Sequence, residues 1–577
     1  MRGRFQLSAI SLCLAVLPLC LALSCGVVGA QSKPDSISGR IVLDDGQPAA
    51  RAMVEITSVG LRSNREQNVE CDETGSFKLS GLAPGSYSVT AVAPGYVSAE
   101  DASVQQYRPG ESVTMRLVKG GVITGRVTDI SGEPLVGTNV KVQRLRDLNG
   151  KRVRNGESWG WNDDWHTDDR GIYRVYGLMP GIYLVSVESG SGIRWYGAVD
   201  NETPTYYPST TRDAAMEITV RPGDEISGID IRLRNDAGRA VSGTLVGTTD
   251  ASQPMNQPGI TLLSATTREI VSSWPVYRSQ TFAFFGIPDG EYELYARLSG
   301  SKEENGAGSA PQRVSVKGAD VTGLTVRMTA YGSISGRIVV EPAKAGEAKC
   351  APQPTNTIEE ILVRAESERR NPRSLNALLG DLDERTDRPI APSEKGEFTL
   401  RSLEPDSYRI EPDLPGDSWF VRSMSLPPSG TAKTRTDAAR VPLTVKAGEK
   451  LSGVEIILAE GAASLSGRVV AKETSSRGTS PLNLRIHLIP AEPTAADDVL
   501  RYRELVTEKD GSFAFNHLAP GKYRLLPRSI PDTEKEKPRP AAFDSTERIK
   551  LRKEAEAANN ELELKPCQRV KEYVLRP

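Results

Sequence analysis

The chain has 577 residues, which is too many for one hydrophobic core, so several domains are expected. Lys and Arg number 72 against 74 Asp and Glu, and this balance excludes the basic excess that is typical of nucleic-acid-binding proteins. Gly (52) and Pro (38) are frequent, but they lack the strict period of collagen.

The N-terminus has the pattern of a secretory signal peptide. Arg2 and Arg4 precede an apolar run over residues 7–23, and small residues lead up to Ala30. We expect residues 1–30 to be removed and the protein to be exported to the periplasm or beyond. Lipid attachment at Cys25 is the less favoured alternative, because the residues before it match such a site poorly. No later apolar run is long enough to cross a bilayer, so no transmembrane segment is expected in the mature chain.

After this segment, short runs alternate apolar and small polar residues, which predicts β-strands. One strand opens around Gly39, and a Gly in such a run indicates a bulge or a close backbone approach. A hairpin follows, with a polar turn at Gly75 and inward-facing Phe77. The chain then turns again before Tyr87, which we expect to face inward with Val89.

This pattern recurs five times, always as an aromatic residue, an aliphatic residue five positions later and a Tyr ten positions after the first. The copies are Phe77/Leu82/Tyr87, Tyr173/Leu178/Tyr183, Phe282/Ile287/Tyr292, Phe398/Leu403/Tyr408 and Phe513/Leu518/Tyr523. Each copy follows an opening glycine, namely Gly39, Gly125, Gly243, Gly336 and Gly467. A fixed spacing inside stretches of unequal length predicts one structural unit copied five times.

Each copy ends on a further alternating strand, which the last copy is expected to place at Leu562–Leu564. The predicted repeat units are 35–118 (unit 1), 119–235 (unit 2, with an aromatic-rich loop), 236–330 (unit 3), 331–460 (unit 4, with a polar insertion) and 461–577 (unit 5, with a C-terminal tail). In unit 4, Asp406 stands where the other copies have Gly, and it is expected to fit that turn less easily.

The opening Gly, the Asp-x-x-Gly-x-Phe turn at Asp72–Phe77 and the Leu-x-Pro-Gly-x-Tyr turn at Leu82–Tyr87 together resemble the carboxypeptidase regulatory-like domain. The resemblance covers nearly all of the chain after residue 35. It implies an all-β fold: a tandem array of five seven-stranded β-sandwiches of Greek-key type, similar also to transthyretin-like and starch-binding-like domains. In metallocarboxypeptidases this domain is accessory and not catalytic, so the resemblance implies no peptidase activity.

Unit 2 gathers aromatic residues that a sandwich core does not require. They are Trp159, Trp161, Trp165, Trp195, Tyr196, Tyr206 and Tyr207. Exposed rings beside acids and amides suit sugar binding, and such rings also make binding hot spots. The favoured alternative is that they pack a long loop onto the sandwich or fill a joint with a neighbouring unit.

Residues for catalysis or metal binding do not converge in the sequence. His166, His487 and His517 lack the spacing of a zinc site, and each is interpreted as an exposed or edge-strand residue. No nucleophile elbow or phosphate loop appears. The acids at Asp163–Asp164 and Asp168–Asp169 could hold calcium, but turn chemistry already explains the second pair.

Three cysteines remain after the signal peptide, namely Cys71, Cys350 and Cys567. A Cys350–Cys567 disulfide fits an oxidising compartment, and three isolated thiols are the slightly favoured alternative.

The sequence therefore predicts an exported, non-enzymatic, multi-domain binding or structural protein of the cell envelope, without cofactor or metal. The alternatives are a carbohydrate-binding protein that uses the unit-2 aromatics and an accessory subunit of an envelope uptake or peptidase system. The expected partners are glycans or another envelope protein.

Overall fold

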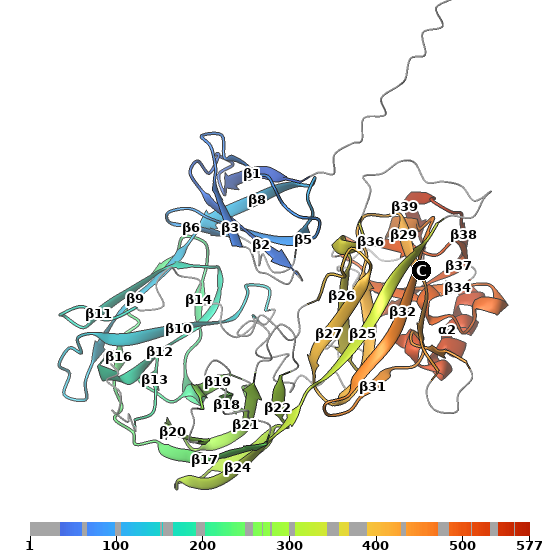
Figure 1. Cartoon of the computed structure of the whole chain (residues 1–577). Helices are drawn as coiled ribbons and strands as arrows, with labels where there is room; N and C mark the ends of the chain where they lie inside the picture. The colour runs from blue at the N-terminus through green and yellow to red at the C-terminus, as the bar shows by residue number, and fades with distance from the viewer. Residues whose placement is uncertain are drawn as a thin grey trace, which may run out of the picture. The chain divides into compact units, whose positions relative to one another are not determined.

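The structure is a computed structural model of the chain (Figure 1). It describes residues 35–59, 66–98, 105–150, 153, 165–191, 202–247, 258–267, 269–276, 280–298, 306–342, 357–368, 389–428, 434–470, 484–508, 510–530, 540–558 and 560–576. Strands predominate among these residues and helices are few, which confirms the predicted all-β fold class. Asp35–Pro577 form one contiguous unit, so the four internal domain boundaries stay a prediction.

The first two repeat units each form two facing sets of strands. Unit 1 has the sheets β4-β1-β8-β6 and β3-β2-β5-β7, and unit 2 has β10-β12-β13, with β14 also on β12, and β11-β9-β15, with β16 also on β9. The strands are β1 Ile37–Leu43, β2 Met53–Val59, β3 Glu66–Glu70, β4 Ser76–Leu79, β5 Ser86–Val92, β6 Tyr96–Ser98, β7 Gln106–Tyr107, β8 Ser112–Lys119, β9 Gly121–Thr128, β10 Thr138–Arg146, β11 Ile172–Leu178, β12 Gly181–Ser191, β13 Thr205–Tyr206, β14 Ile218–Val220, β15 Glu225–Ile226 and β16 Ile231–Arg232, with the 3-10 turn η2 Arg212–Ala214.

Units 3 and 4 vary the same plan. In unit 3, β22 pairs with both β21 and β24 and so joins the two layers into one eight-stranded sheet, whereas unit 4 keeps β27-β25-β32-β29-β30 apart from β26-β28-β31. The strands are β17 Arg239–Gly247, β18 Gly259–Ser264, β19 Ile270–Pro275, β20 Thr281–Ile287, β21 Gly290–Leu298, β22 Ala307–Ser309, β23 Gln312–Val316, β24 Val321–Ala330, β25 Gly332–Glu341, β26 Leu362–Ser367, β27 Glu397–Leu403, β28 Asp406–Asp413, β29 Trp419–Leu426, β30 Thr436–Asp437, β31 Leu443–Val445 and β32 Lys450–Glu460, with η3 Ile358–Glu360.

Unit 5 adds a helix to its two sheets, β36-β33-β39 and β35-β34-β37-β38. Its elements are β33 Ala463–Val469, β34 Leu484–Pro490, η4 Pro493–Ala495, η5 Val499–Arg501, β35 Arg503–Val506, β36 Ser512–Leu518, β37 Gly521–Ser529, η6 Ala541–Phe543, α2 Ser545–Ala558, β38 Glu561–Leu564 and β39 Arg569–Leu575. The expected closing strand at Leu562–Leu564 is wrong in role: β38 lies antiparallel to β37, and β39 is the strand that pairs parallel to the opening strand β33.

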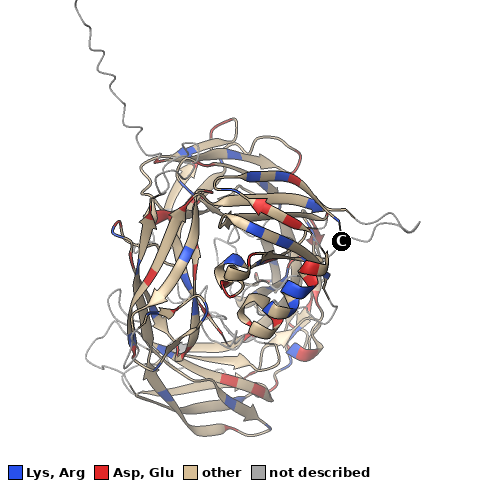
Figure 2. Cartoon of the chain, turned by 90° about the vertical axis from the view of Figure 1, so that its right-hand side faces the viewer, with Lys and Arg blue, Asp and Glu red and all other residues tan. Residues whose placement is uncertain are grey.

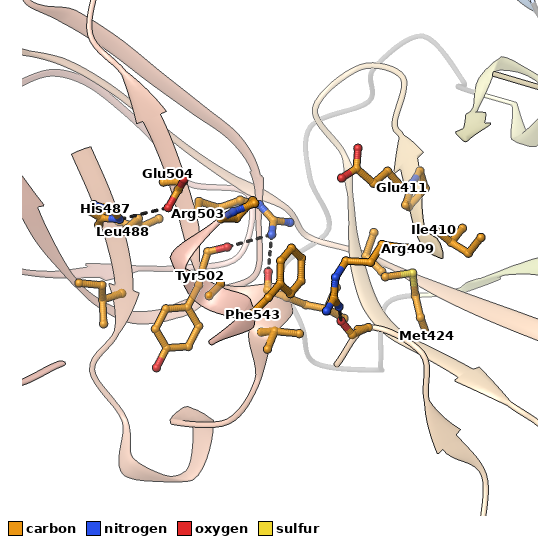
Figure 3. A pocket seen from close by; sticks show the side chains of 18 of the residues that line it. Arg409, Ile410, Glu411, Met424, His487, Leu488, Tyr502, Arg503, Glu504 and Phe543 are labelled. Atoms are coloured by element: carbon orange, nitrogen blue, oxygen red, sulfur yellow. Dashed lines mark hydrogen bonds and ion pairs between the residues drawn. The ribbon is translucent and has the colours of Figure 1, made fainter. Parts of the chain in front are cut away.

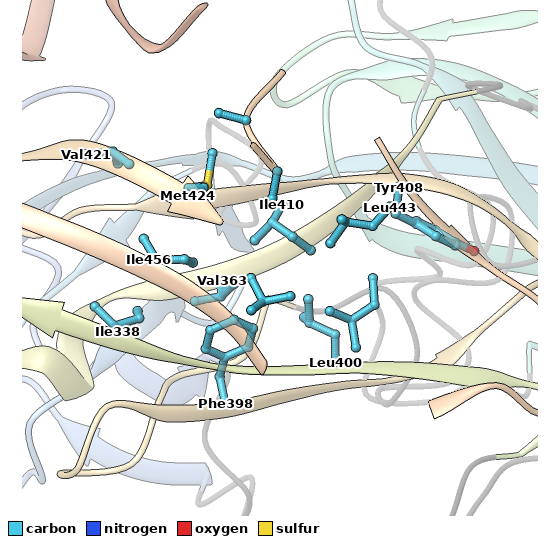
Figure 4. Packing of buried hydrophobic residues seen from close by; sticks show 14 of the residues in the cluster. Ile338, Val363, Phe398, Leu400, Tyr408, Ile410, Val421, Met424, Leu443 and Ile456 are labelled. Atoms are coloured by element: carbon cyan, nitrogen blue, oxygen red, sulfur yellow. The ribbon is translucent and has the colours of Figure 1, made fainter. Parts of the chain in front are cut away.

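The five recurrent triplets lie in the cores. Every aromatic, aliphatic and Tyr residue of the pattern is buried, and each triplet belongs to its own hydrophobic cluster. Figure 4 shows this for unit 4, where the Phe398 ring packs among Ile338, Val363 and Ile456. Burial of large apolar side chains is the main stabilising contribution to such a core. The recurrent spacing is therefore a core pattern.

The opening glycines are required because two strands approach their Cα atoms. In every unit the Gly faces the motif aromatic across an antiparallel pair, as Gly39 faces Phe77. A Cβ at these glycines would lie only 2.0–2.2 Å from a carbonyl oxygen of the last strand or its flanking residue. This confirms the predicted close backbone approach. The first strand of each unit therefore lies between the hairpin and the closing strand of the same unit, to which it is parallel.

The motif tyrosines are held by the same hydrogen bond in all five units. Each hydroxyl donates to the backbone carbonyl four residues earlier, at distances of 2.6–2.8 Å, and the donors are Tyr87, Tyr183, Tyr292, Tyr408 and Tyr523. The bond satisfies a buried hydroxyl and fixes the turn before it. Asp406 fits this turn in unit 4 because its backbone is not left-handed there, and its carboxylate accepts from Ser367 and from the Ser407 amide. The expected misfit of Asp406 is therefore wrong.

Candidate functional site

The unit-2 aromatics are described only in part. Trp159, Trp161, Trp195 and Tyr196 lie outside the described residues. Trp165 and Tyr207 are partly buried and pack against the unit-2 core. Tyr206 lies on β13, with the Arg212 guanidinium carbon 5.9 Å from the centroid of its ring. The role of this group in sugar binding stays a prediction.

The three histidines differ from one another in their surroundings. His166 is exposed, as predicted. His487 is 4% exposed on β34, between β35 and β37, so its interpretation as an exposed or edge-strand residue is wrong. His517 is partly buried, and its Nδ1 donates to the Trp419 carbonyl at 2.9 Å. Burial lowers the pKa of His517, which keeps this ring neutral near pH 7.

The two described cysteines differ in oxidation state: Cys71 is a thiol and Cys567 is part of a disulfide. Cys71 is a buried free thiol, and burial, with Asp72 and Glu70 adding, raises its pKa to about 11. Cys567 is disulfide-bonded, while the predicted partner, Cys350, lies outside the described residues. The alternative of three isolated thiols is therefore wrong for Cys567.

The acidic pair at Asp168–Asp169 behaves as turn residues. The Asp168 carboxylate accepts from the backbone amides of Arg170 and Ile172 at 2.9 and 2.8 Å. Among the described residues no set of three or more His, Cys, Asp or Glu side chains is grouped as metal ligands would be. The other acids of the calcium alternative, Asp163 and Asp164, lie outside the described part of the chain.

An enclosed site lies where unit 5 meets unit 4. A cavity of about 340 Å³ is bounded by β28 and β29 on one side and by β34, β35, η5, η6 and α2 on the other (Figure 3). Its volume lies at the lower end of the range that binds small molecules. Both walls are mostly apolar, and a few ionisable side chains interrupt them.

His487 and Glu504 form a largely buried pair on this cavity. The strand register places them directly opposite on β34 and β35, and His487 Nδ1 lies 3.4 Å from Glu504 Oε2. Burial alone would raise the pKa of Glu504, but the hydrogen bond and charge of His487 outweigh it and hold that pKa below its usual range. Glu504 also accepts from the Ala541 amide at 3.2 Å. The pair therefore ties β34, β35 and η6 together.

The two arginines on the cavity wall, Arg409 and Arg503, have different partners. Arg409 stacks on Phe543, with its guanidinium carbon 3.7 Å from the ring centroid, and it also bonds Glu368 and the Ala439 carbonyl. Arg503 donates from Nη1 to the carbonyls of Leu500 (2.7 Å) and Tyr502 (3.2 Å) (Figure 3). Burial lowers the pKa of Arg503.

Sequence reasoning missed this site because its parts come together only through strand register and through the contact of two units. One of its signals was available. Asp544 precedes Ser545–Thr546–Glu547 and a run of strong helix formers, which is the pattern of a helix N-terminus. The Asp544 carboxylate indeed accepts from the amides of Thr546 and Glu547, at 2.8 and 3.1 Å.

Residues 36–118 match the family model of the carboxypeptidase regulatory-like domain, so the chain contains this domain at unit 1. No curated protein matches the chain.

Several solved structures are similar to parts of the chain. The Bacillus anthracis TIE protein is 17% identical over 51% of this chain and 51% of its own, with a TM-score of 0.14, so the chain spans about half of its length. A minor pilin of Streptococcus agalactiae is 13% identical over 37% of this chain and 100% of its own, with a TM-score of 0.20. The shaft pilin SpaA of Lactobacillus rhamnosus GG is 13% identical over 35% and 98%, with a TM-score of 0.16.

Proposed function

We propose that the chain is an exported, non-enzymatic structural and binding protein of the cell envelope, built from five β-sandwich domains in tandem. The observation that carries this proposal is that the recurrent residues of each repeat are buried in the core of that repeat. The aromatic ring covers the opening Gly, and the Tyr hydroxyl bonds the turn before it. A unit whose recurrent residues are buried supplies length and surface when it is repeated, and it supplies no reactive centre.

The joints between consecutive units support a spacer role. Only Gly120 separates β8 from β9, and only Tyr331 separates β24 from β25. So short a connection has few rotatable backbone bonds, which restricts the rotation of one unit against the next. Lys and Arg are interspersed with Asp and Glu along the strands (Figure 2), as suits a solvated surface. No helix of the described residues has the length and apolarity to span a membrane.

Export and binding can be tested separately. A C-terminally tagged chain should be recovered outside the cytoplasm, and the same chain without residues 1–30 should stay inside. Purified residues 31–577 should then bind isolated envelopes saturably. A full-length chain that remains in the cytoplasm, or binding that never saturates, would contradict the proposal. Chemical cross-linking that recovers an uptake or peptidase component would assign the chain as an accessory subunit.

Carbohydrate binding is the second candidate, because four of the six Trp residues fall between Trp159 and Trp195. Titration of soluble glycans against the Trp fluorescence of the whole chain would test it. A Trp159→Ala/Trp161→Ala double variant should lose the response, whereas Trp419→Phe, a change in the unit-4 core, should keep it. Unchanged fluorescence across a broad glycan panel would exclude this function.

A further inference from the structure

The cavity between units 4 and 5 is lined by one cation, Arg503, that no carboxylate of the described residues contacts directly. Among the described residues Arg503 forms no ion pair, and its hydrogen-bond partners are two carbonyl oxygens, both bonded to one nitrogen, Nη1. An arginine has five N–H donors, so the donors on Nε and Nη2 remain for another acceptor. Arg503 is partly buried, and a partly buried cation without an ion-pair partner favours the entry of an anion.

The other charged groups on the cavity are already committed. Glu504 is held by His487 and the Ala541 amide, and Arg409 is held by Glu368 and backbone carbonyls. Glu411 also lines the cavity, and the charges of Asp498 and Glu411 favour the protonated form of Arg503 without an ion pair to either. Arg503 is therefore the group on this wall that can anchor an anion.

The walls around this anchor are apolar and come from both units. Ile410, Val421 and Met424 line it from unit 4, and Leu488, Leu500 and Phe543 line it from unit 5. A fully charged ligand such as a phosphate would leave these walls unused. A ligand with one anionic end and an apolar body would satisfy the guanidinium and remove the walls from water together.

We propose that this cavity binds a small amphipathic monocarboxylate, whose carboxylate accepts from the unused donors of Arg503 and whose apolar body packs on Ile410, Met424 and Phe543. The volume of about 340 Å³ sets the size class at a short acyl chain or a single-ring acid. The site is independent of the structural role proposed above, because none of these residues belongs to the repeated triplets.

Calorimetric titration of residues 31–577 with octanoate, and with octan-1-ol as its uncharged counterpart, tests the proposal. Octanoate should bind at least tenfold more tightly than octan-1-ol, because hydrogen bonds to a charged group are stronger than neutral ones. In Arg503→Met the two affinities should become equal. Arg468→Met, which removes an exposed arginine of the same unit, should bind as the wild type does.

Two further variants keep the test decisive if Arg503→Met perturbs folding. Met424→Trp fills the cavity from the unit-4 side and should abolish binding of both probes. Glu411→Gln removes the neighbouring negative charge and should tighten octanoate alone. Equal binding of the two probes by the wild type, or an absence of heat with either probe up to millimolar concentration, would overturn the proposal.

Discussion

The repeated hairpin and the helix-covered face of unit 5 use their residues in opposite ways. In the hairpin, the ring of Phe77 packs against the opening glycine, and the hydroxyl of Tyr87 donates to the backbone carbonyl of the turn before it. The four other units have an aromatic residue and a Tyr at the same two positions. On the unit-5 face, His487, Glu504 and Arg503 are unique to one unit and line a cavity. Repetition therefore marks the residues that fold the array, whereas an individual function is to be sought where one unit departs from the common plan.

The largest effect is expected at an opening glycine. Gly336→Ala would place a Cβ 2.2 Å from the Val454 carbonyl oxygen and 2.7 Å from the Phe398 ring. Because backbone atoms cannot give way cheaply, unit 4 should lose about 4 kcal/mol of stability, measured by hydrogen exchange of residues 397–403. Gly259→Ala is the matched control, since its Cβ would find its nearest neighbour at 3.9 Å. Equal hydrogen-exchange protection in the two variants would show that the close approach at Gly336 is not what the unit requires.

The helix-covered face should respond locally. Leu551 is 1% exposed and clusters with Ile489 and Tyr502, so Leu551→Ala should cost about 3 kcal/mol and release α2. Ile549 on the same helix is 59% exposed, and Ile549→Ala should be nearly neutral. Hydrogen exchange over residues 545–558 measures both. If Leu551→Ala also weakened the repeated hairpin at 512–523, the two regions would not be independent.

Identical Tyr→Phe substitutions in units 1 and 5 sharpen the contrast. Tyr87→Phe removes one hydrogen bond and should cost about 1 kcal/mol. Tyr523→Phe should cost about 2 kcal/mol, because the Tyr523 hydroxyl also accepts from Arg501 Nε at 3.2 Å and the buried arginine would lose that partner. Local hydrogen exchange in each unit gives both values. Equal costs would mean that unit 5 uses its motif tyrosine only as the other units do.

The smallest effect is a pH dependence of the hairpin turns. Hydrogen bonds to Asp72, chiefly from the Thr74 hydroxyl, hold its pKa below its usual range. The Ile172 amide and the Arg170 side chain lower the pKa of Asp168 in the same way. A depressed folded-state pKa gives a stabilisation that is present above about pH 4, the unfolded value, and is lost as pH falls through the folded pKa.

Unit 4 has Ser393 at this turn, whose hydroxyl accepts from the Glu397 amide at 3.1 Å and does not titrate. The Asp72→Ser/Asp168→Ser variant should therefore lose less stability than the wild type between pH 7 and pH 3, measured by urea unfolding at each pH. A wild-type loss as small as that of the variant would contradict this sign.

Patterns that depend on local spacing were predictable, and those that depend on register between distant strands were not. The close approach at Gly39 and the burial of Tyr87 follow from alternation and from the needs of tight backbones. The pairing of His487 with Glu504 depends on the register of β34 and β35, which no residue between them specifies. The role of β39 was missed because an earlier alternating run, at Leu562–Leu564, matched the expected closing strand equally well.

The residue just before the aliphatic motif residue also has a role that the sequence did not reveal. Units 1–3 place a glycine there with φ of 67–82°, but Ser402 and His517 take the same left-handed backbone in units 4 and 5. Their side chains contact the preceding unit: the Gly306 amide donates to Ser402 Oγ at 3.4 Å, and His517 bonds the Trp419 carbonyl. Sequence alone does not show that a replaced glycine has become part of a joint.

Because the opening strand of each unit pairs with the closing strand, the N-terminal part of a unit has no complete sheet until the distant C-terminal part arrives. A chain that emerges from a ribosome or a translocation channel can therefore close each sandwich only after its final strand is free, and non-local pairing of this kind is slow. Folding should therefore proceed vectorially, one unit at a time, as each closing strand becomes free.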